Sequence, residues 1–286
     1  MELTVISGKG GTGKTTIALA LSELAKDAVK VDCDVDAPNL YLFYGGRDIK
    51  KEFFYGEEKA VIDKKFCTDC KECEKVCQFD AIKDGIVNPL KCEGCGACIL
   101  VCPQKAVSLK EEKTADVYIT QTNKGIISRA QMEVGSEGSG KLITWLRSNA
   151  RKFADENNLI IIDGSPGIGC PVISSITGSD AVLIVTEPTQ SGLEDLKRVM
   201  ELCRHFEVPA FVCINKYDIN EKKTEEIESF CKETDVYLVG KIPFDDIVMK
   251  SINELKPIVY YDGSKANQAI RQMWDNISKY IKYLNQ

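Results

Sequence analysis

The sequence has little of three features that mark common protein classes: long hydrophobic runs, a surplus of basic residues, and histidine. No apolar run approaches the ~18 residues that a membrane span needs. The 43 acidic residues outnumber the 37 basic ones, whereas nucleic-acid backbones are bound by clustered Lys and Arg. We therefore expect no nucleic-acid partner, and membrane association is not favoured. Because the first residues contain no basic region followed by a cleavage site, we expect a cytoplasmic protein.

Cysteine, by contrast, is abundant, and its 13 residues are unevenly placed. Eight of them lie between Cys67 and Cys102, while the other five are scattered along the chain. Disulfide scaffolds belong to short secreted chains, so these thiols are expected to be reduced or metal-bound. The cysteine-rich stretch is therefore flanked on both sides by sequence that contains few cysteines.

Outside the cysteine-rich stretch, short apolar runs alternate with segments of helical pattern. This alternation predicts an α/β fold with a mostly parallel, doubly wound sheet covered by helices on both faces. Residues 115–122 and 126–134 are expected to form a hairpin around Asn123-Lys124-Gly125. The expected parallel strands lie at Leu3–Ile6, Ala28–Val31, Leu159–Ile162, Ala181–Val185 and Pro209–Ile214.

A glycine-rich loop follows the first expected strand and opens a helix. In that context the pattern G-x-x-x-x-G-K-[ST] indicates a P-loop, in which backbone N–H groups and the helix N-terminus surround the phosphates. Lys14 is expected to reach the β and γ phosphates of ATP, and the Thr15 hydroxyl to bind Mg²⁺. A structural glycine turn is the alternative. The predicted nucleotide-binding residues are Gly8, Lys9, Gly10, Gly11, Thr12, Gly13, Lys14, Thr15 and Thr16.

Two aspartates follow expected strands at the edge of the sheet where the P-loop lies. Asp34 comes shortly after Ala28–Val31, and Asp163 comes directly after Leu159–Ile162. Open α/β sheets place ligand groups at this edge. We expect Asp34 to bind Mg²⁺ and to orient the attacking water, and we assign Asp163 to the catalytic group with Lys14. Helix caps or solvated loop residues are the alternative for both aspartates.

The eight clustered cysteines repeat one spacing twice. The pattern C-x2-C-x2-C-x3-C is typical of bacterial ferredoxins, in which the fourth cysteine of each run serves the other cluster. Zinc is the alternative, although structural zinc prefers two separated ligand pairs. Gln78 replaces the proline that usually follows the fourth cysteine, which loosens that turn without removing a ligand. We predict two [4Fe-4S] clusters, one on Cys67, Cys70, Cys73 and Cys102 and one on Cys92, Cys95, Cys98 and Cys77.

The connection between Val31 and Leu159 is too long for a plain βα loop, which indicates an inserted domain. Charged stretches at residues 56–65 and 110–113 suggest its edges. We predict a P-loop ATPase domain in two parts, residues 1–56 and 111–286, and an inserted small α+β ferredoxin domain at residues 57–110.

The loop around Lys9 carries a family resemblance. K-G-G-T-G-K-T-T resembles the deviant Walker A loop of the superfamily of MinD, ParA and the nitrogenase iron protein. Residues 31–40 look like its first switch, and residues 161–167 look like its second. The resemblance implies a dimer in which the earlier lysine, here Lys9, reaches the nucleotide of the partner. Lys9 therefore joins the predicted catalytic residues.

Later segments resemble the strand ends and base-contacting loops of the same superfamily. They lie at residues 186–189, 215–216 and 242–245, so that the resemblance covers nearly the whole chain outside the insert. It implies that the base of ATP is contacted by Asn215, Pro243 and Asp245. Asparagine at a strand end is also a routine turn residue.

The combination resembles the MinD superfamily ATPases that contain an inserted ferredoxin domain. That resemblance implies slow, partner-stimulated ATP hydrolysis that couples nucleotide state to electron transfer or metal-cluster assembly. It also implies a homodimer or a heterodimer with a similar ATPase, and a redox or metal-cluster partner protein. The alternative is a carrier or scaffold for Fe-S or other metal clusters. A spatial organiser on a membrane or nucleoid is favoured neither by the charge nor by the insert.

Two further features have competing interpretations. Cys170 matches the spacing of a cluster ligand in the nitrogenase iron protein, but residues 132–141 hold no second cysteine. A small buried thiol is therefore favoured over a subunit-bridging cluster. A C-terminal apolar stripe favours packing on the core over docking on a membrane. Its members are Ile270, Met273, Trp274, Ile277, Ile281 and Leu284.

Overall fold

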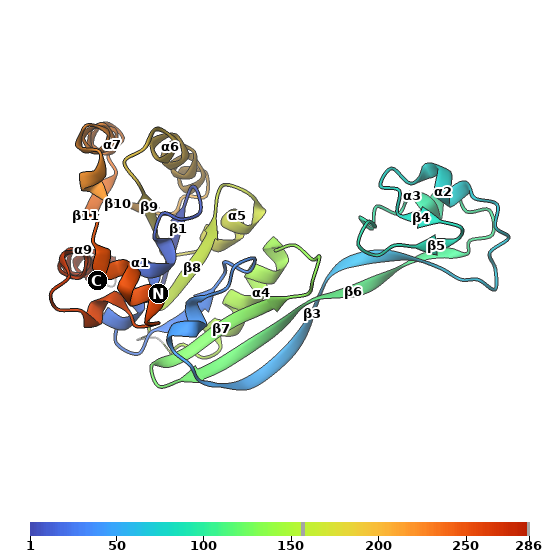
Figure 1. The fold of residues 1–286 in the computed structure, drawn as a ribbon, viewed down its shortest axis with the longest axis horizontal. Coiled ribbons are helices and arrows are strands. Elements are labelled where there is room, and N and C mark those ends of the chain that lie inside the picture. The colour runs from blue at the N-terminus through green and yellow to red at the C-terminus, as the bar shows by residue number, and fades with distance from the viewer. Residues whose placement is uncertain (156–157, 285–286) are drawn as a thin grey trace. The chain divides into compact units, whose positions relative to one another are not determined.

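The chain forms two compact units. The computed structural model describes residues 1–155 and 158–284, and Figure 1 shows its elements. The second unit contains all eight clustered cysteines. The first unit comprises Met1–Lys51, Val117–Gln131 and Gly138–Gln286, and the second comprises Glu52–Asp116 and Met132–Glu137.

Nine strands form one sheet in the order β11-β10-β9-β1-β8-β2-β7-β6-β3 (Figure 1). Every neighbouring pair from β11 to β7 is parallel. The mostly parallel sheet expected from the apolar runs is therefore confirmed. Its strands are Glu2–Ser7 (β1), Val29–Asp32 (β2), Arg47–Ile62 (β3), Val107–Thr122 (β6), Gly125–Met132 (β7), Ile160–Pro166 (β8), Ala181–Thr186 (β9), Ala210–Asn215 (β10) and Tyr237–Ile242 (β11).

Helices cover both faces of this sheet, because successive side chains of each buried strand point to opposite faces. In β9, Leu183 and Val185 pack in the core shared with α1 and α9, while Val182 and Ile184 pack in the core shared with α5, α6 and α7. The helices are Lys14–Leu24 (α1), Gly140–Arg151 (α4), Cys170–Ile176 (α5), Gln190–His205 (α6), Glu221–Glu233 (α7), Asp246–Asn253 (α8) and Lys265–Leu284 (α9). Short 3-10 turns lie at Leu40–Phe43 (η1), Tyr217–Ile219 (η2) and Ile258–Tyr260 (η3).

The C-terminal helix α9 packs on the core, as its apolar stripe predicted. Ile270, Met273 and Ile277 are buried, and Trp274 and Ile281 pack against the same cluster. The side chain of Leu284, the last member of the stripe, lies outside the described residues. No helix in the described part of the chain combines the length and the apolar character that crossing a bilayer requires.

Strands β3 and β6 are longer than the sequence suggested, with 16 residues each. The charged stretches that we interpreted as domain edges lie largely within these strands and not in loops. Most side chains of β3 are exposed, so its charged side chains stay in water and do not destabilise the strand. The backbone N–H and C=O groups form the hydrogen bonds of the sheet whatever the side chain is. The expected hairpin is confirmed, because β6 and β7 are neighbours joined at Asn123-Lys124.

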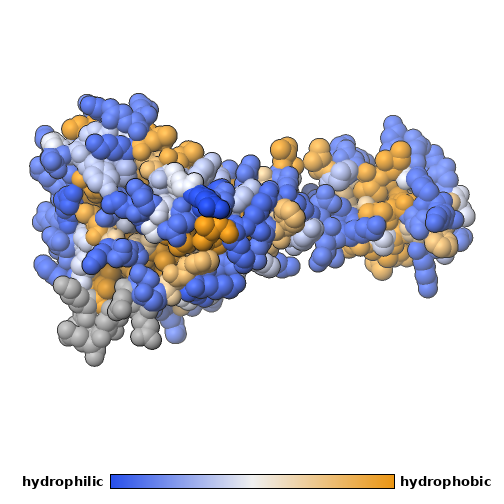
Figure 2. All heavy atoms as spheres, turned by 90° about the horizontal axis from the view of Figure 1, so that it is seen from below, coloured by the Kyte–Doolittle hydropathy of each residue, from blue (hydrophilic) through white to orange (hydrophobic). Residues whose placement is uncertain are grey.

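The second unit repeats one small arrangement around its cysteines. Its two short helices each begin after a left-handed residue, Lys71 with φ 62° and Gly96 with φ 76°. A small core of cysteines and apolar residues, including Ile82 and Val107, joins the two halves. Figure 2 shows hydrophobic residues in orange between the hydrophilic ones on the molecular surface. The elements are Glu72–Val76 (α2), Ile82–Lys83 (β4), Ile86–Val87 (β5) and Ala97–Val101 (α3).

Candidate functional site

The P-loop connects β1 to α1 at the carboxyl edge of the parallel strands, and two of its positions require glycine. Gly13 has φ 89° and precedes α1, and a side chain there would place a carbon 2.4 Å from Asn215 Nδ2. At Gly8, an added Cβ would lie 2.2 Å from the Cβ of Asp195. The loop therefore follows a path that other residues cannot adopt, with its amides free to approach a phosphate.

Lys14 is the centre of a buried charge group in the first unit. Its Nζ lies 2.6 Å from Asp163 Oδ1 and 3.2 Å from Asp34 Oδ2. Burial disfavours the charged ammonium, but the carboxylates of Asp163 and Asp34 outweigh this effect and hold the pKa of Lys14 above its ordinary value. The structure thus brings together three of the predicted catalytic residues.

Asp32 belongs to the same charge group, although the sequence analysis did not single it out. Its Oδ2 accepts a hydrogen bond from the Leu40 amide at 3.1 Å, while its Oδ1 is buried without a partner among the described residues. Burial, reinforced by the charge of Asp163, raises the pKa of Asp32 to about 8. The signal that could have found it is the position of Asp32 at the end of β2, two residues before Asp34.

Two other buried oxygens near Lys14 also lack a hydrogen-bond partner among the described residues. They are Asp163 Oδ2 and Thr12 Oγ1. Buried polar atoms are normally paired, and an unpaired carboxylate or hydroxyl oxygen is able to bind an ion or a ligand. Carboxylate and hydroxyl oxygens are the ligands that Mg²⁺ prefers. The oxygen donors around Lys14 and Thr15 therefore fit a magnesium ion with a phosphate group.

An open cavity of about 600 Å³ adjoins the P-loop. Several predicted residues line it, among them Lys14, Thr15 and Asp34. The sequence analysis missed other lining residues, because they come from the switch segments, from the start of α5 and from α8, and their role in the cavity depends on the fold. They are Asp36, Ala37, Asn39, Ser165, Pro166, Gly169, Pro171 and Ile252.

Lys9 lies against its own chain. Its Nζ is 3.4 Å from Glu187 Oε2 and 3.2 Å from the Ser191 hydroxyl. Glu187 also binds Lys216 at 2.6 Å, so that this carboxylate joins two lysines. The predicted reach of Lys9 to the nucleotide of a partner stays a prediction, and it requires these contacts to be released.

The predicted base-contacting residues hold protein groups in this structure. Asn215 Nδ2 donates to the Thr12 carbonyl oxygen of the P-loop at 2.7 Å. Asp245 caps α8 by accepting from the Ile247 amide at 2.9 Å, and it accepts from the Ser264 hydroxyl at 2.7 Å. Pro243 lies in the loop between β11 and α8. Contact of Asn215, Pro243 and Asp245 with a base stays a prediction.

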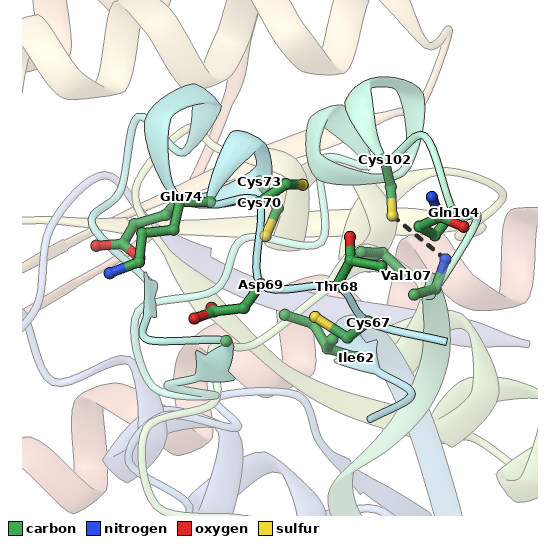
Figure 3. A pocket seen from close by; sticks show the side chains of 13 residues that line it. Ile62, Cys67, Thr68, Asp69, Cys70, Cys73, Glu74, Cys102, Gln104 and Val107 are labelled. Atoms are coloured by element: carbon green, nitrogen blue, oxygen red, sulfur yellow. Dashed lines mark hydrogen bonds between the residues drawn. The ribbon is translucent and has the colours of Figure 1, made fainter. Parts of the chain in front are cut away.

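The eight clustered cysteines divide between two pockets of the second unit. All are free thiols. Figure 3 shows the side chains around the first pocket. The first is lined by Cys67, Cys70, Cys73 and Cys102, and the second by Cys77, Cys92, Cys95 and Cys98. The fold thus brings together the two interleaved sets that the spacing predicts.

Backbone amides point at cysteine sulfurs in matching positions of the two halves. The Ala81 amide donates to Cys77 Sγ at 3.3 Å, and the Ala106 amide donates to Cys102 Sγ at 3.3 Å, each four residues along. A third amide donates to Cys92 Sγ at 3.4 Å. N–H groups of this kind stabilise the negative charge of metal-bound sulfur.

In residues 1–155 and 158–284, no group of three or more His, Cys, Asp or Glu side chains has the spacing to hold one metal ion. Thiolates that bind one zinc ion at about 2.3 Å lie within about 4 Å of each other. The cysteines of a [4Fe-4S] cluster bind four different irons and therefore stand farther apart. Both cysteine pockets combine thiols with apolar side chains and N–H donors, and the binding of a cluster there stays a prediction.

Our interpretation of Cys170 as a buried thiol is wrong. Cys170 is exposed, because it occupies the first position of α5, next to Gly169 and Pro171 that line the nucleotide cavity. The spacing between Asp163 and Cys170 could not reveal the exposure of Cys170, since it does not show that the short helix α5 begins there. No second cysteine accompanies it in residues 132–141.

Comparisons with known proteins agree with the P-loop geometry. The family model CbiA, the CobQ/CobB/MinD/ParA nucleotide binding domain, matches residues 3–258. An uncharacterized protein of Methanocaldococcus jannaschii is 36% identical over 285 residues, which is 98% of each chain. An iron-sulfur cluster carrier protein of Pyrococcus abyssi is 23% identical, over 98% of this chain and 86% of that relative.

A solved structure shares the mostly parallel P-loop sheet. It is the septum site-determining protein MinD of Pyrococcus horikoshii complexed with Mg-ADP, which superposes with a TM-score of 0.61 at 19% identity. The match covers 98% of this chain and 96% of that chain.

Replacing Asp32 should change how the stability of the nucleotide-free protein depends on pH. Because its pKa is raised to about 8 from the ordinary 3.8, the folded state keeps a proton between these values that the unfolded state has lost. Stability therefore falls as pH rises through this range. Asp32→Asn, which carries no charge, should remove that loss and unfold a few degrees higher than the wild type at about pH 8.

The measurement is the unfolding temperature by circular dichroism at several pH values between 5 and 8.5. Asp36→Asn, at an exposed switch position, is the control and should keep the wild-type slope. Parallel slopes for the wild type and Asp32→Asn would contradict the assignment.

Proposed function

We propose that this chain, which belongs to the CobQ/CobB/MinD/ParA nucleotide-binding family, is a dimeric ATPase with a ferredoxin unit that holds two [4Fe-4S] clusters. Its nucleotide state controls electron transfer, or metal-cluster assembly, with a partner protein. ATP binding of the MinD/ParA type is the property that it shares with its family. The observation that carries the proposal is the division of eight cysteines between two pockets in interleaved sets, on a chain that also has a P-loop.

ATP hydrolysis is proposed to use the charge group around Lys14. Lys14 exchanges the Asp163 carboxylate for the β and γ phosphates, which leaves carboxylate oxygens available for Mg²⁺ together with the Thr15 hydroxyl. Asp34 then accepts a hydrogen bond from the attacking water and aligns it with the γ phosphate. The buried oxygens of Asp32 and Asp163 that have no hydrogen-bond partner among the described residues support this assignment.

The cysteine pockets are proposed to hold the two clusters, each of which accepts and gives one electron when bound. Cys67, Cys70, Cys73 and Cys102 hold one cluster, and Cys77, Cys92, Cys95 and Cys98 hold the other. The backbone N–H groups that donate to sulfur stabilise the negative charge of each cluster site, and the apolar side chains of the pockets exclude water.

A clasp around Arg129 supports coupling between the nucleotide and the second unit. The Arg129 guanidinium lies 4.5 Å from the ring centre of Tyr41 and 4.3 Å from that of Tyr118. It also donates to both carboxylate oxygens of Asp48, at 2.9 and 3.0 Å. Tyr41 lies in η1 directly after the first switch, whereas Asp48 and Tyr118 lie in β3 and β6, which continue into the second unit. A movement of the switch is therefore communicated to both strands.

A cluster carrier or scaffold is the second candidate function. The relative from Pyrococcus abyssi that is named an iron-sulfur cluster carrier protein favours it, as do the exposed thiols of Cys70 and Cys95. ATP-stimulated electron transfer without loss of iron supports the first function. Stoichiometric delivery of iron and sulfide to an acceptor apo-protein supports the carrier.

Protein purified without oxygen should contain about eight iron and eight sulfide per chain, because two [4Fe-4S] clusters require them. Cys70→Ala removes one ligand of the first set and should lower the iron content to about half, while nucleotide binding by the other unit is kept. Cys170→Ala, which changes an exposed cysteine outside both sets, should leave iron unchanged. Iron and sulfide assays with the visible absorption near 400 nm test this, and stoichiometric zinc without that absorption would overturn the cluster assignment.

Lys9→Ala should weaken ATP-dependent dimerisation and ATP turnover together, by about tenfold or more, while nucleotide binding survives through Lys14 and the loop amides. Lys14→Ala should instead impair nucleotide binding itself, since it removes a charged contact to the phosphates. The measurements are sedimentation velocity with a nonhydrolysable ATP analogue and ATP turnover, each on the wild type and both variants. If Lys9→Ala dimerises and hydrolyses ATP like the wild type, Lys9 does not act across a dimer interface.

A further inference from the structure

Residues 133–138, which lie between β7 and α4 (Figure 1), belong to both units and have no role in the proposed mechanism. Met132–Glu137 is part of the second unit, and the first unit resumes at Gly138. The contacts of this segment therefore divide at the peptide bond between Glu137 and Gly138, and each contact lies inside its own unit. We call residues 133–138 the strap.

The first-unit end of the strap lies against the first switch. The Gly138 amide donates to Asp36 Oδ1 at 3.1 Å, and Asp36 lines the nucleotide cavity. A Cβ added at Gly138 would lie 2.5 Å from Val35 Cγ2, so the backbone of the strap packs on the switch without space for a side chain. A displacement of the switch toward the strap therefore displaces Gly138.

The residues that follow Gly138 are held in place. The Ser139 hydroxyl caps α4 by accepting from the Leu142 amide at 3.3 Å, and Leu142 is buried. A Cβ added at Gly140 would lie 2.4 Å from Ser174 Oγ on α5. Because the cap and this close packing fix the start of α4, a displacement of Gly138 is taken up by residues 133–137.

The second-unit end of the strap is anchored on β6 and lies against Leu90. The Glu133 amide donates to the Thr114 carbonyl oxygen at 2.8 Å, and the Glu133 carboxylate pairs with Lys113 at 2.5 Å. Gly135 has φ 85°, and a Cβ added there would lie 2.9 Å from Leu90 Cδ2. Gly135 and Leu90 also line an open cavity of about 350 Å³, which gives the strap space to move against Leu90.

Leu90 belongs to a turn that is bonded to the second cysteine set. Its amide donates to Asn88 Oδ1 at 3.0 Å, and the Cys92 amide donates to the Asn88 carbonyl oxygen at 3.1 Å. The Asn88 amide in turn donates to the Ala81 carbonyl oxygen at 2.7 Å, and the Ala81 amide donates to Cys77 Sγ at 3.3 Å. The turn at residues 88–92 therefore positions two cysteines of this set and one N–H donor to sulfur, which are groups that tune a bound cluster.

The first cysteine set is connected to the strap less directly. Its N–H donor, the Ala106 amide, bonds to Cys102 Sγ just before β6 begins. The strap meets β6 farther along, at Thr114. A displacement of the strap thus reaches Leu90 by direct contact and Cys102 only along β6.

We propose that the strap couples the first switch to the second cysteine set, so that the nucleotide state acts mainly on the cluster held by Cys77, Cys92, Cys95 and Cys98. The inference rests on the proposed function and names the cluster that is regulated. The γ phosphate of ATP adds negative charge to the cavity that the Asp36 carboxylate lines, and ADP lacks this group. That difference biases the position of the switch and the strap, because a ligand shifts an equilibrium only by its differential interaction with the two states.

Hydrogen exchange measured by mass spectrometry tests this on the full cluster-containing chain, with MgADP and with a nonhydrolysable ATP analogue. Backbone amides in residues 88–92 should exchange at rates that differ about fivefold or more between the two nucleotides. Residues 67–73, which belong to the first cysteine set, should differ by less than about twofold.

Leu90→Ala removes the side chain that lies against Gly135 and should reduce the difference at residues 88–92 to less than about twofold, while residues 31–40 of the first switch keep theirs. Leu90 is 73% exposed, so its truncation should not unfold the second unit. Leu100→Ala, which truncates an 88% exposed leucine on α3 of the same unit, is the matched control and should keep the wild-type difference.

A redox titration assigns the effect to a cluster. In Cys70→Ala, which keeps the second cysteine set complete, the potential of the remaining cluster should still differ between the two nucleotides. Adding Leu90→Ala to this variant should remove that difference.

The outcomes separate this inference from the proposed function. Exchange at residues 88–92 that is the same with both nucleotides in the wild type would overturn the inference, and so would a Leu90→Ala variant that keeps the wild-type difference. Either result leaves the proposed function standing when the same sample binds both nucleotides and contains about eight iron per chain. A sample that lacks the iron or binds neither nucleotide would contradict the proposed function, and the inference with it.

Discussion

The charge balance of the candidate nucleotide site in the first unit depends on the ion pairs of buried Lys14 with Asp163 and Asp34. With Asp32 nearby, negative groups outnumber the single ammonium, and burying an uncompensated charge is costly. The site relieves part of this excess by keeping a proton on Asp32, whose pKa is raised. Phosphates add more negative charge, so a nucleotide needs a divalent cation to bind here. The charge balance of the apo site thus argues for a magnesium nucleotide.

The cost of burying uncompensated negative charge also applies in the second unit. Burial raises the pKa of the Cys73 and Cys98 thiols above the ordinary value, so that forming thiolates in these pockets requires compensating positive charge. Iron supplies that charge in the proposed clusters, and the amides of Ala81 and Ala106 add to it. In the proposed function, a metal therefore balances anionic ligands in both units.

Much of this was predictable from the sequence because local spacing carries the chemistry. The P-loop pattern fixes the positions of Lys14 and Thr15, and the apolar runs predict β1, β2, β8, β9 and β10 with little ambiguity. The cysteine spacing predicts which thiols share a pocket, since in this pattern the fourth cysteine of each run belongs to the set of the other run.

What the sequence did not predict depends on contacts between distant segments. The charged residues of β3 and β6 resemble a surface linker, and only strand pairing shows that they lie in a ladder. The sequence indicates only that Asp32 ends a strand, because its burial beside Lys14 depends on the fold. The exposure of Cys170 follows from where α5 begins, and the contact of Asp218 with Phe244 joins residues 26 apart in the chain.

The central claim is that the nucleotide state changes the properties of the clusters. The most direct measurement is a redox titration of the clusters, followed by electron paramagnetic resonance, with MgADP and with a nonhydrolysable ATP analogue. We expect the midpoint potentials to differ by about 60 mV, which corresponds to a tenfold coupling for one electron. Arg129→Met, which removes the clasp to Asp48, should reduce that difference. Potentials that are identical with both nucleotides in the wild type would contradict the account.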